Sequence, residues 1–120
     1  MNFFGGIMTK VISLGGSIVA PSTPDIEFLE QFHTAILSWL AKSADNRIIF
    51  IVGGGAPARA WQEAYRKISK AHDCEAQDWI GIMATRLNAQ LIKAIFSDQC
   101  PQDVVTNPEA VTIFAGKILV

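Results

Sequence analysis

The residues best suited to chemistry are three consecutive glycines, Gly53 to Gly55, which follow the apolar run Ile48–Val52 and precede a helical pattern. Glycine lets the backbone approach a ligand and adopt positive φ, and a helix N-terminus supplies unpaired N–H groups with a partial positive charge. Arg59 falls in the first turn of that helix, where its guanidinium suits a pair of phosphate oxygens. The segment therefore predicts a phosphate-binding turn.

A second, shorter glycine turn, Gly15-Gly16, follows the apolar run Val11–Leu14. Neither turn has the G-x4-G-K-[ST] pattern of a Walker-type phosphate loop. Gly53, Gly55 and Ala58 do fit a variant of the dinucleotide fingerprint, G-x-G-x-x-A, so a Rossmann-type dinucleotide binder is one alternative. The plainer alternative is that the glycines only turn a strand into a helix.

A polar stripe is expected on the third helix. Asp78, Gly81, Thr85 and Asn88 fall at i, i+3, i+7 and i+10, so they share one face. Asp78 is expected in the first turn of this helix, where its carboxylate could accept hydrogen bonds from sugar hydroxyls. The alternative is a helix-start charge and two packing polar groups. Arg86 is expected to be a surface cation, with a place in a cleft wall as the alternative.

No set of side chains for nucleophilic or acid–base catalysis is evident, so no catalytic residue is assigned. His33 falls in the middle of a helix and His72 in a polar break, and both are expected to be structural or solvated. Cys74 and Cys100 form no C-x-x-C and have no nearby histidine pair, so no metal site is predicted. Two free thiols indicate a reducing compartment.

The composition excludes several other classes of protein. The chain has 120 residues, enough for one domain with a core, and its charged fraction is only 18%. A net charge of −1 without a basic block gives no electrostatic surface for nucleic acid or an anionic membrane. No membrane span or signal peptide is predicted, so the expected location is the cytoplasm. Residues 1–9 are interpreted as an N-terminal leader.

Strand and helix patterns alternate along the chain, which predicts a parallel sheet with helices on both faces. The third helix is apolar on most of its circumference and is expected to be largely buried. The final strand has no helix after it, which suggests a chain cut inside a larger fold. The expected elements are strands at 10–14, 47–52, 103–105 and 117–120, a loop at 17–22, and helices at 23–44, 57–70, 76–96 and 107–115.

Four segments, in this order, resemble the amino acid kinase superfamily and, within it, the archaeal-type UMP kinases: VISLGGS, PDIEFL, IIFIVGGGAPAR and DWIGIMATRLNA. The likeness covers nearly all of residues 10–120, but only the N-terminal half of such an enzyme. It implies a three-layer α/β/α sandwich with a mainly parallel sheet, here truncated. It also implies phosphoryl transfer from ATP, with Mg²⁺, to UMP, a step of pyrimidine nucleotide biosynthesis.

The resemblance also implies roles for individual residues. The residues at the ATP and transferring phosphates would be Leu14, Gly15, Gly16, Gly55 and Arg59. The UMP-binding residues would be Gly53, Gly54 and Asp78, with Asp78 at the ribose.

The chain departs from the family pattern at Ser13, where many members carry a lysine. Lys10 is no substitute, because it is expected on the other sheet face. The isolated chain is expected to have little or no kinase activity. An exposed apolar face is expected where the rest of the sheet should pack, and it should favour a homo-oligomer. Two alternatives within this fold are another kinase of the superfamily and an inactive nucleotide-binding or regulatory module.

Overall fold

The computed structural model describes residues 8–70, 73–111 and 113–120. The leader predicted at residues 1–9 lies outside this description except for Met8 and Thr9, which belong to the first strand. The elements are β1 (Met8–Leu14), α1 (Gly16–Val19), α2 (Ile26–Ala41), β2 (Asn46–Val52), α3 (Gly55–Ile68), α4 (Cys74–Ile95), a 3-10 helix η1 (Pro108–Ala110) and β3 (Ile118–Leu119).

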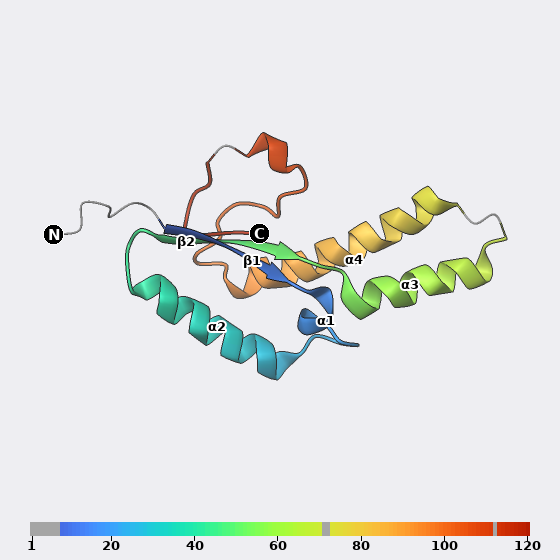
Figure 1. Cartoon of the computed structure of the whole chain (residues 1–120), viewed down its shortest axis with the longest axis horizontal. Coiled ribbons are helices and arrows are strands. Elements are labelled where there is room, and N and C mark those ends of the chain that lie inside the picture. Colours follow the sequence, from blue (N-terminus) through green and yellow to red (C-terminus); the bar gives the residue numbers. More distant parts are fainter. Residues whose placement is uncertain (1–7, 71–72, 112) are drawn as a thin grey trace.

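The three strands form one parallel sheet in the order β1-β2-β3 (Figure 1). β1 pairs with β2 from Met8 opposite Asn46 to Leu14 opposite Val52. The predicted α/β class with a parallel sheet is confirmed. Since parallel strands end at the same edge of a sheet, β1 and β2 deliver their two glycine turns to neighbouring positions.

The core lies between one face of the sheet and the helices α2 and α4. Phe50 of β2 packs against Phe32 of α2 and against Phe96, which caps the end of α4, with tilted rings whose centroids lie 5.5 Å apart in both pairs. His33 lies 5.0 Å from the ring of Phe96, which gives it a packing role, as predicted. Within the described residues both helices therefore cover the Phe50 face. On the opposite face, Val11 and Ile51 are 65% and 57% exposed.

The helices begin and end at residues other than the predicted ones, because local hydrogen bonds cap them there. The loop predicted at 17–22 instead begins with α1, whose first hydrogen bonds run from Ile18 and Val19 to the Gly15 carbonyl. The helix predicted to start at residue 23 starts at Ile26, because the carboxylate of Asp25 caps it by accepting from the Phe28 N–H at 3.0 Å. α2 ends at Ala41, three residues before the predicted Ala44.

Two predictions near the C-terminus were wrong. Residues 103–105 form no strand, although the Val105 N–H donates to the Val120 carbonyl at 2.8 Å. The helix predicted at 107–115 is only the 3-10 turn η1, capped by Asn107 through the Glu109 N–H. The β-branched residues Val111 and Ile113 follow this turn, and such side chains disfavour continuing a helix. The strand predicted at 117–120 is present as β3.

The helix predicted at 76–96 corresponds to α4, and the prediction that it is largely buried was also wrong. Only Asn88, Ala89 and Ile92 of α4 are buried. The N-terminal half of α4 runs beyond the sheet beside α3 (Figure 1), and Trp79, Met83 and Leu87 on it are 49%, 56% and 69% exposed. The described residues contain no helix with the length and apolarity required to span a membrane.

The antiparallel pair α3–α4 projects beyond the carboxyl end of the sheet and lengthens the molecule, which measures 65 × 34 × 21 Å (Figure 1). Side chains of α3 bind the backbone of α4 at two points. Gln62 donates to the Gln77 carbonyl at 3.1 Å, and the Tyr65 hydroxyl accepts from the Asp73 N–H at 3.1 Å. These bonds fix the residues of one helix relative to those of the other.

Candidate functional site

The glycine turn after β2 has the backbone shape of an anion-binding nest, in which successive N–H groups converge on one point. Gly54 has right-handed helical angles (φ −85°, ψ −32°), and Gly55 has a φ of +61°. This alternation of hand is the arrangement that forms such a nest, and only glycine adopts the second conformation without strain. Among the described residues, the N–H groups of Gly54 and Gly55 have no hydrogen-bond partner. The turn therefore has free donors at the N-terminus of α3.

The two glycine turns pack backbone against backbone. A Cβ atom placed on Gly16 would lie 2.1 Å from the Gly55 nitrogen and 2.5 Å from the Gly54 carbonyl carbon. The Gly53 N–H donates to the Leu14 carbonyl at 2.9 Å and extends the strand pairing into the turn. Gly15 faces solvent, while Leu14 and Gly16 are buried. The structure thus brings the two predicted phosphate-binding turns into contact.

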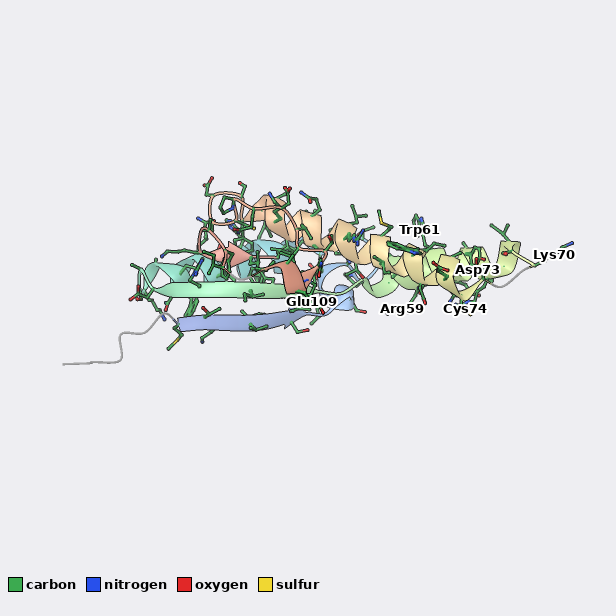
Figure 2. All side chains as sticks on the ribbon, turned by 90° about the horizontal axis from the view of Figure 1, so that it is seen from above. Arg59, Trp61, Lys70, Asp73, Cys74 and Glu109 are labelled. Carbon is green, nitrogen blue, oxygen red and sulfur yellow. The ribbon has the colours of Figure 1, made fainter. Side chains whose placement is uncertain are left out.

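An open cavity of about 790 Å³ lies between the turn, α3 and α4. It collects four of the predicted site residues, namely Gly54, Gly55, Arg59 and Asp78. The Arg59 guanidinium donates to the Ser17 hydroxyl at 3.2 Å, so it spans from α3 to the first glycine turn. Figure 2 shows Arg59 and Trp61 on opposite sides of α3, with Arg59 on the cavity side. The remaining predicted residues, Leu14, Gly15, Gly16 and Gly53, do not line this cavity.

Three of the four residues of the polar stripe of α4 line the same cavity, but Asp78 is not in the first turn as predicted. α4 begins at Cys74, and Asp73 is its cap, accepting from the N–H groups of Glu75 and Ala76 at 3.0 and 3.3 Å. Asp78 lies one turn further along, where its carboxylate faces the cavity instead of the helix start. Gly81 and Thr85 continue this wall.

Asn88 ends the stripe beneath the glycine turn. Its side chain is 4% exposed, and its amide nitrogen donates to the carbonyls of Gly53 at 2.9 Å and Gly54 at 3.2 Å. Asn88 is the buried member of the stripe, and the partners that a buried amide requires are the carbonyls of the turn itself.

Sequence reasoning missed several residues of the cavity wall. Gln62 follows Ala58 by four residues and Arg59 by three, so helical spacing could have predicted that Gln62 lies beside them on α3. Thr106 reaches the cavity from the C-terminal segment, and no local pattern signals this. Arg86 also lines the cavity, with its guanidinium 5.7 Å from the Trp79 ring. Of the two interpretations of Arg86, a surface cation and a residue of a cleft wall, the second is therefore correct.

The charged side chains on the cavity wall are Arg59, Arg86 and Asp78, which leaves a positive excess. Two other cations of α3, Arg66 and Lys67, form ion pairs with Glu63 at 2.5 and 3.6 Å, outside the cavity. The hydrogen bond and charge of Arg66 lower the pKa of Glu63 below its ordinary value. The cavity thus suits an anion with hydroxyl groups near Asp78.

Ser13 stands where many family members carry a lysine, and it adds no cation beside the glycine turns. Ser13 is exposed on β1, opposite Ile51 of β2. The ammonium of Lys10 lies 4.9 Å from the centre of the Trp39 ring on α2, so it belongs to the other face of the sheet, as expected. Arg59, whose guanidinium donates to Ser17 beside the first turn, is therefore the cation that links the two turns.

A family model described as the amino acid kinase family matches residues 8–119. A uridylate kinase of Pyrococcus abyssi is 34% identical over 100 residues, which are 83% of this chain and 42% of that protein. A uridylate kinase of Methanobrevibacter smithii is 38% identical over 116 residues, covering 94% of this chain and 48% of that protein.

The crystal structure of uridylate kinase from Archaeoglobus fulgidus superposes on this fold with a TM-score of 0.71 and 27% sequence identity. The match covers 93% of this chain and 49% of that structure. The chain thus spans about half the length of the curated relatives it matches.

Proposed function

This chain belongs to the amino acid kinase family, and from that premise we propose that it forms the nucleotide- and phosphate-binding half of a UMP kinase. The reaction would be ATP + UMP → ADP + UDP. The observation that carries the proposal is the single cavity shared by the nest at Gly54–Gly55, Arg59 and Asp78. A nest and a guanidinium bind phosphate, and a carboxylate at the far wall binds sugar hydroxyls, which together match a nucleoside monophosphate.

The division of roles follows the family resemblance. UMP would lie over Gly53 and Gly54 with its ribose at Asp78. The transferring phosphate would lie at Gly55 and Arg59. The ATP phosphates would follow the first turn at Leu14, Gly15 and Gly16. The backbone contact between Gly16 and Gly55 supports this, because phosphoryl transfer requires donor and acceptor phosphates held side by side.

The chain's own groups would act by position and charge. N–H donors and Arg59 would neutralise charge on the phosphate oxygens, which is the main contribution a protein makes to this reaction. Mg²⁺ with ATP is part of the proposal. The ion would be bound through the ATP phosphates, as is usual for Mg²⁺ at nucleotide sites.

We propose a cytoplasmic location as well. The described residues contain two free thiols, Cys74 on the surface and Cys100 in the core, and neither forms a disulfide. Burial raises the pKa of Cys100 above its ordinary value, so this thiol stays protonated and unreactive. Free thiols are typical of reducing compartments.

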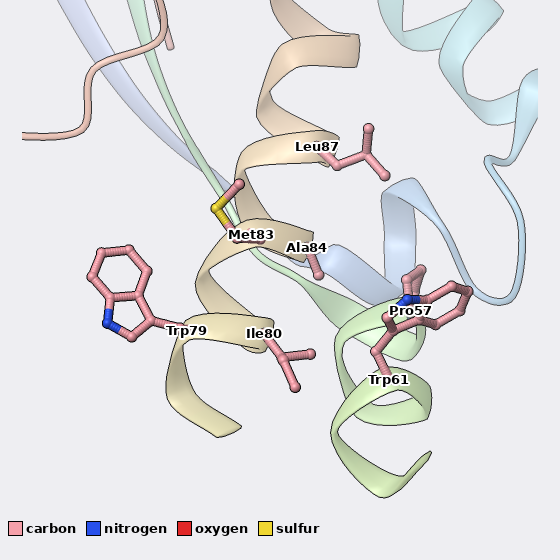
Figure 3. Close-up of a pocket in the computed structure, with 7 residues that line it drawn as sticks. All are labelled: Pro57, Trp61, Trp79, Ile80, Met83, Ala84 and Leu87. Carbon is pink, nitrogen blue, oxygen red and sulfur yellow. The ribbon is translucent and has the colours of Figure 1, made fainter. Parts of the chain in front are cut away.

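We further propose that the chain self-associates through an apolar surface on the far side of α3 and α4 from the cavity. This surface surrounds a pocket of about 430 Å³ (Figure 3). Trp61, Met83 and Leu87 in it are 68%, 56% and 69% exposed, which is unusual for a solvated helix pair. Its residues are Pro57, Trp61, Trp79, Ile80, Met83, Ala84 and Leu87.

Calorimetric titration of the chain with UMP tests the proposed function. We expect UMP to bind, and Arg59→Ala to weaken binding roughly tenfold or more, as for a lost charge-assisted hydrogen bond. Lys67→Ala is the matched control, because it removes a cation from α3 outside the cavity and should leave the affinity unchanged. Absence of UMP binding, or binding of NAD in its place, would contradict the proposal.

An assay that follows ADP formation distinguishes an enzyme from a binding module. We expect little or no turnover from this chain alone, since its relatives are about twice as long. Nucleotide binding without turnover in a full-length parent would favour the alternative of an inactive or regulatory module, for which Ser13 is the supporting feature. A different acceptor preferred over UMP in that parent would favour another kinase of the family.

A further inference from the structure

Asn88 and Asn46 are the two buried polar residues among the described ones, at 4% and 7% exposure. A buried amide costs free energy unless its hydrogen bonds are satisfied. Asn46 satisfies its own with the Trp39 carbonyl at 2.9 Å, at the opposite end of β2 from the glycine turn. Asn88 instead donates to two successive carbonyls of the turn, Gly53 and Gly54.

This pair of bonds determines which way the N–H groups of the turn point. In a trans peptide the carbonyl of one residue and the N–H of the next point in opposite directions. Since Asn88 holds the carbonyls of Gly53 and Gly54 toward α4, the N–H groups of Gly54 and Gly55 are directed away from it. The Gly54 carbonyl also accepts from the Ala58 N–H, at a longer 3.5 Å. Glycines have wide conformational freedom, so the shorter bonds from Asn88 are the stronger constraint on the two peptide planes.

We propose that Asn88 is a positioning residue that orients the N–H groups of Gly54 and Gly55 for the phosphate of the nucleotide. This inference rests on the proposed function, because it assumes that the nest binds that phosphate. Asn88 touches the turn from beneath and is absent from the cavity wall, so it acts only through the backbone. A donor amide is required, because a carboxylate or an apolar side chain at this position offers no hydrogen to either carbonyl.

The role predicts an effect on phosphate recognition that a purely structural role would not produce. UMP and uridine share base and ribose and differ in the phosphate, so the ratio of their affinities measures the contribution of the phosphate alone. Asn88→Ala and the isosteric Asn88→Asp should lower this ratio by roughly tenfold to a hundredfold, the usual effect of losing hydrogen bonds to a charged group. The affinity for uridine should change little.

Asn46→Ala is the matched control, because it removes an equally buried amide with one backbone partner far from the turn. It should destabilise the fold while keeping the wild-type ratio of UMP to uridine affinity. Calorimetry with both ligands is run well below the unfolding midpoint of each variant, and circular dichroism confirms the fold. Asn88→Asp keeps the shape of the side chain, so it provides the comparison if Asn88→Ala does not fold.

The outcomes separate this inference from the proposed function. If the wild-type chain binds UMP more tightly than uridine and the Asn88 variants keep that ratio, the positioning role is wrong and the proposed function stands. If the wild-type chain shows no preference for UMP over uridine, the inference and the phosphate site both fail. An equal loss of both affinities in the Asn88 variants also overturns the positioning role.

Discussion

At the scale of single residues, the site depends on glycines for close approach and on one amide for orientation. Gly16 and Gly55 meet backbone to backbone, and Gly55 has positive φ. Asn88 holds the carbonyls on the other side of the same turn. The turn is thus fixed by contacts with two segments distant in sequence, which leaves Arg59 on the cavity wall and directs the free N–H groups of Gly54 and Gly55 away from α4.

Substitution of Gly16 by alanine should be strongly destabilising. The added Cβ would meet the Gly55 nitrogen at 2.1 Å, and a backbone atom cannot move aside as a flexible side chain can. We expect a loss of about 2 kcal/mol or more in the free energy of unfolding, measured by urea denaturation. Gly15→Ala is the control, because a Cβ there would meet only Ile18 at an ordinary 3.8 Å. Equal denaturation midpoints for the two variants would contradict the close approach.

At the scale of elements, α4 connects the core to the cavity. Its C-terminal half packs Ile92 and the following Phe96 into the core, while its N-terminal half lies beside α3 and carries Asp78. Asp73 begins the helix by accepting two N–H groups that otherwise have no partner. The exposed end of α4 therefore relies on its cap more than the buried end does.

Replacing Asp73 by alanine should weaken the start of α4. A lost N-cap costs about 1 kcal/mol in the free energy of unfolding. The backbone N–H of the same residue donates to the Tyr65 hydroxyl, and alanine keeps this donor. Thermal unfolding should show a midpoint several degrees lower. Asp98→Ala is a suitable control, since it removes the same charge from an exposed turn after α4. If both variants unfold at one temperature, the cap contributes nothing measurable.

At the scale of the whole molecule, the two sides of the α3–α4 pair differ in chemistry. One side carries the polar cavity with Arg59 and Asp78, and the other carries the apolar surface around Trp61 and Leu87 (Figures 2 and 3). A second copy on the apolar surface would leave the cavity open. Burying that surface would remove the exposed apolar area that distinguishes α4 from an ordinary surface helix.

A charge placed on the apolar surface should prevent self-association. Leu87 is 69% exposed, so Leu87→Glu should leave the fold intact and shift the mass measured by light scattering from an oligomer to a monomer. Gln90→Glu adds the same charge at another exposed position of α4, outside the apolar pocket, and should keep the oligomer. A wild-type chain that is monomeric at high concentration, or an unchanged mass for Leu87→Glu, would rule out this interface.

The sequence by itself determined the family, the parallel α/β class and the order of most elements. These depend on local signals: apolar runs for β1 and β2, helical spacing for α2 to α4, and glycines where strands end. The four-segment resemblance is confirmed by a family match over residues 8–119. The roles implied for Leu14, Gly53 and the other site residues stay predictions.

Only the tertiary structure decided how these elements meet. The contact of Gly16 with Gly55, the bonds of Asn88 to the turn and the approach of Thr106 join segments far apart in sequence, and no spacing along the chain encodes them. The same holds for the exposure of α4, because an apolar stripe shows that a helix needs a partner but not whether this chain provides one. Local patterns determine the elements, whereas long-range packing determines the site.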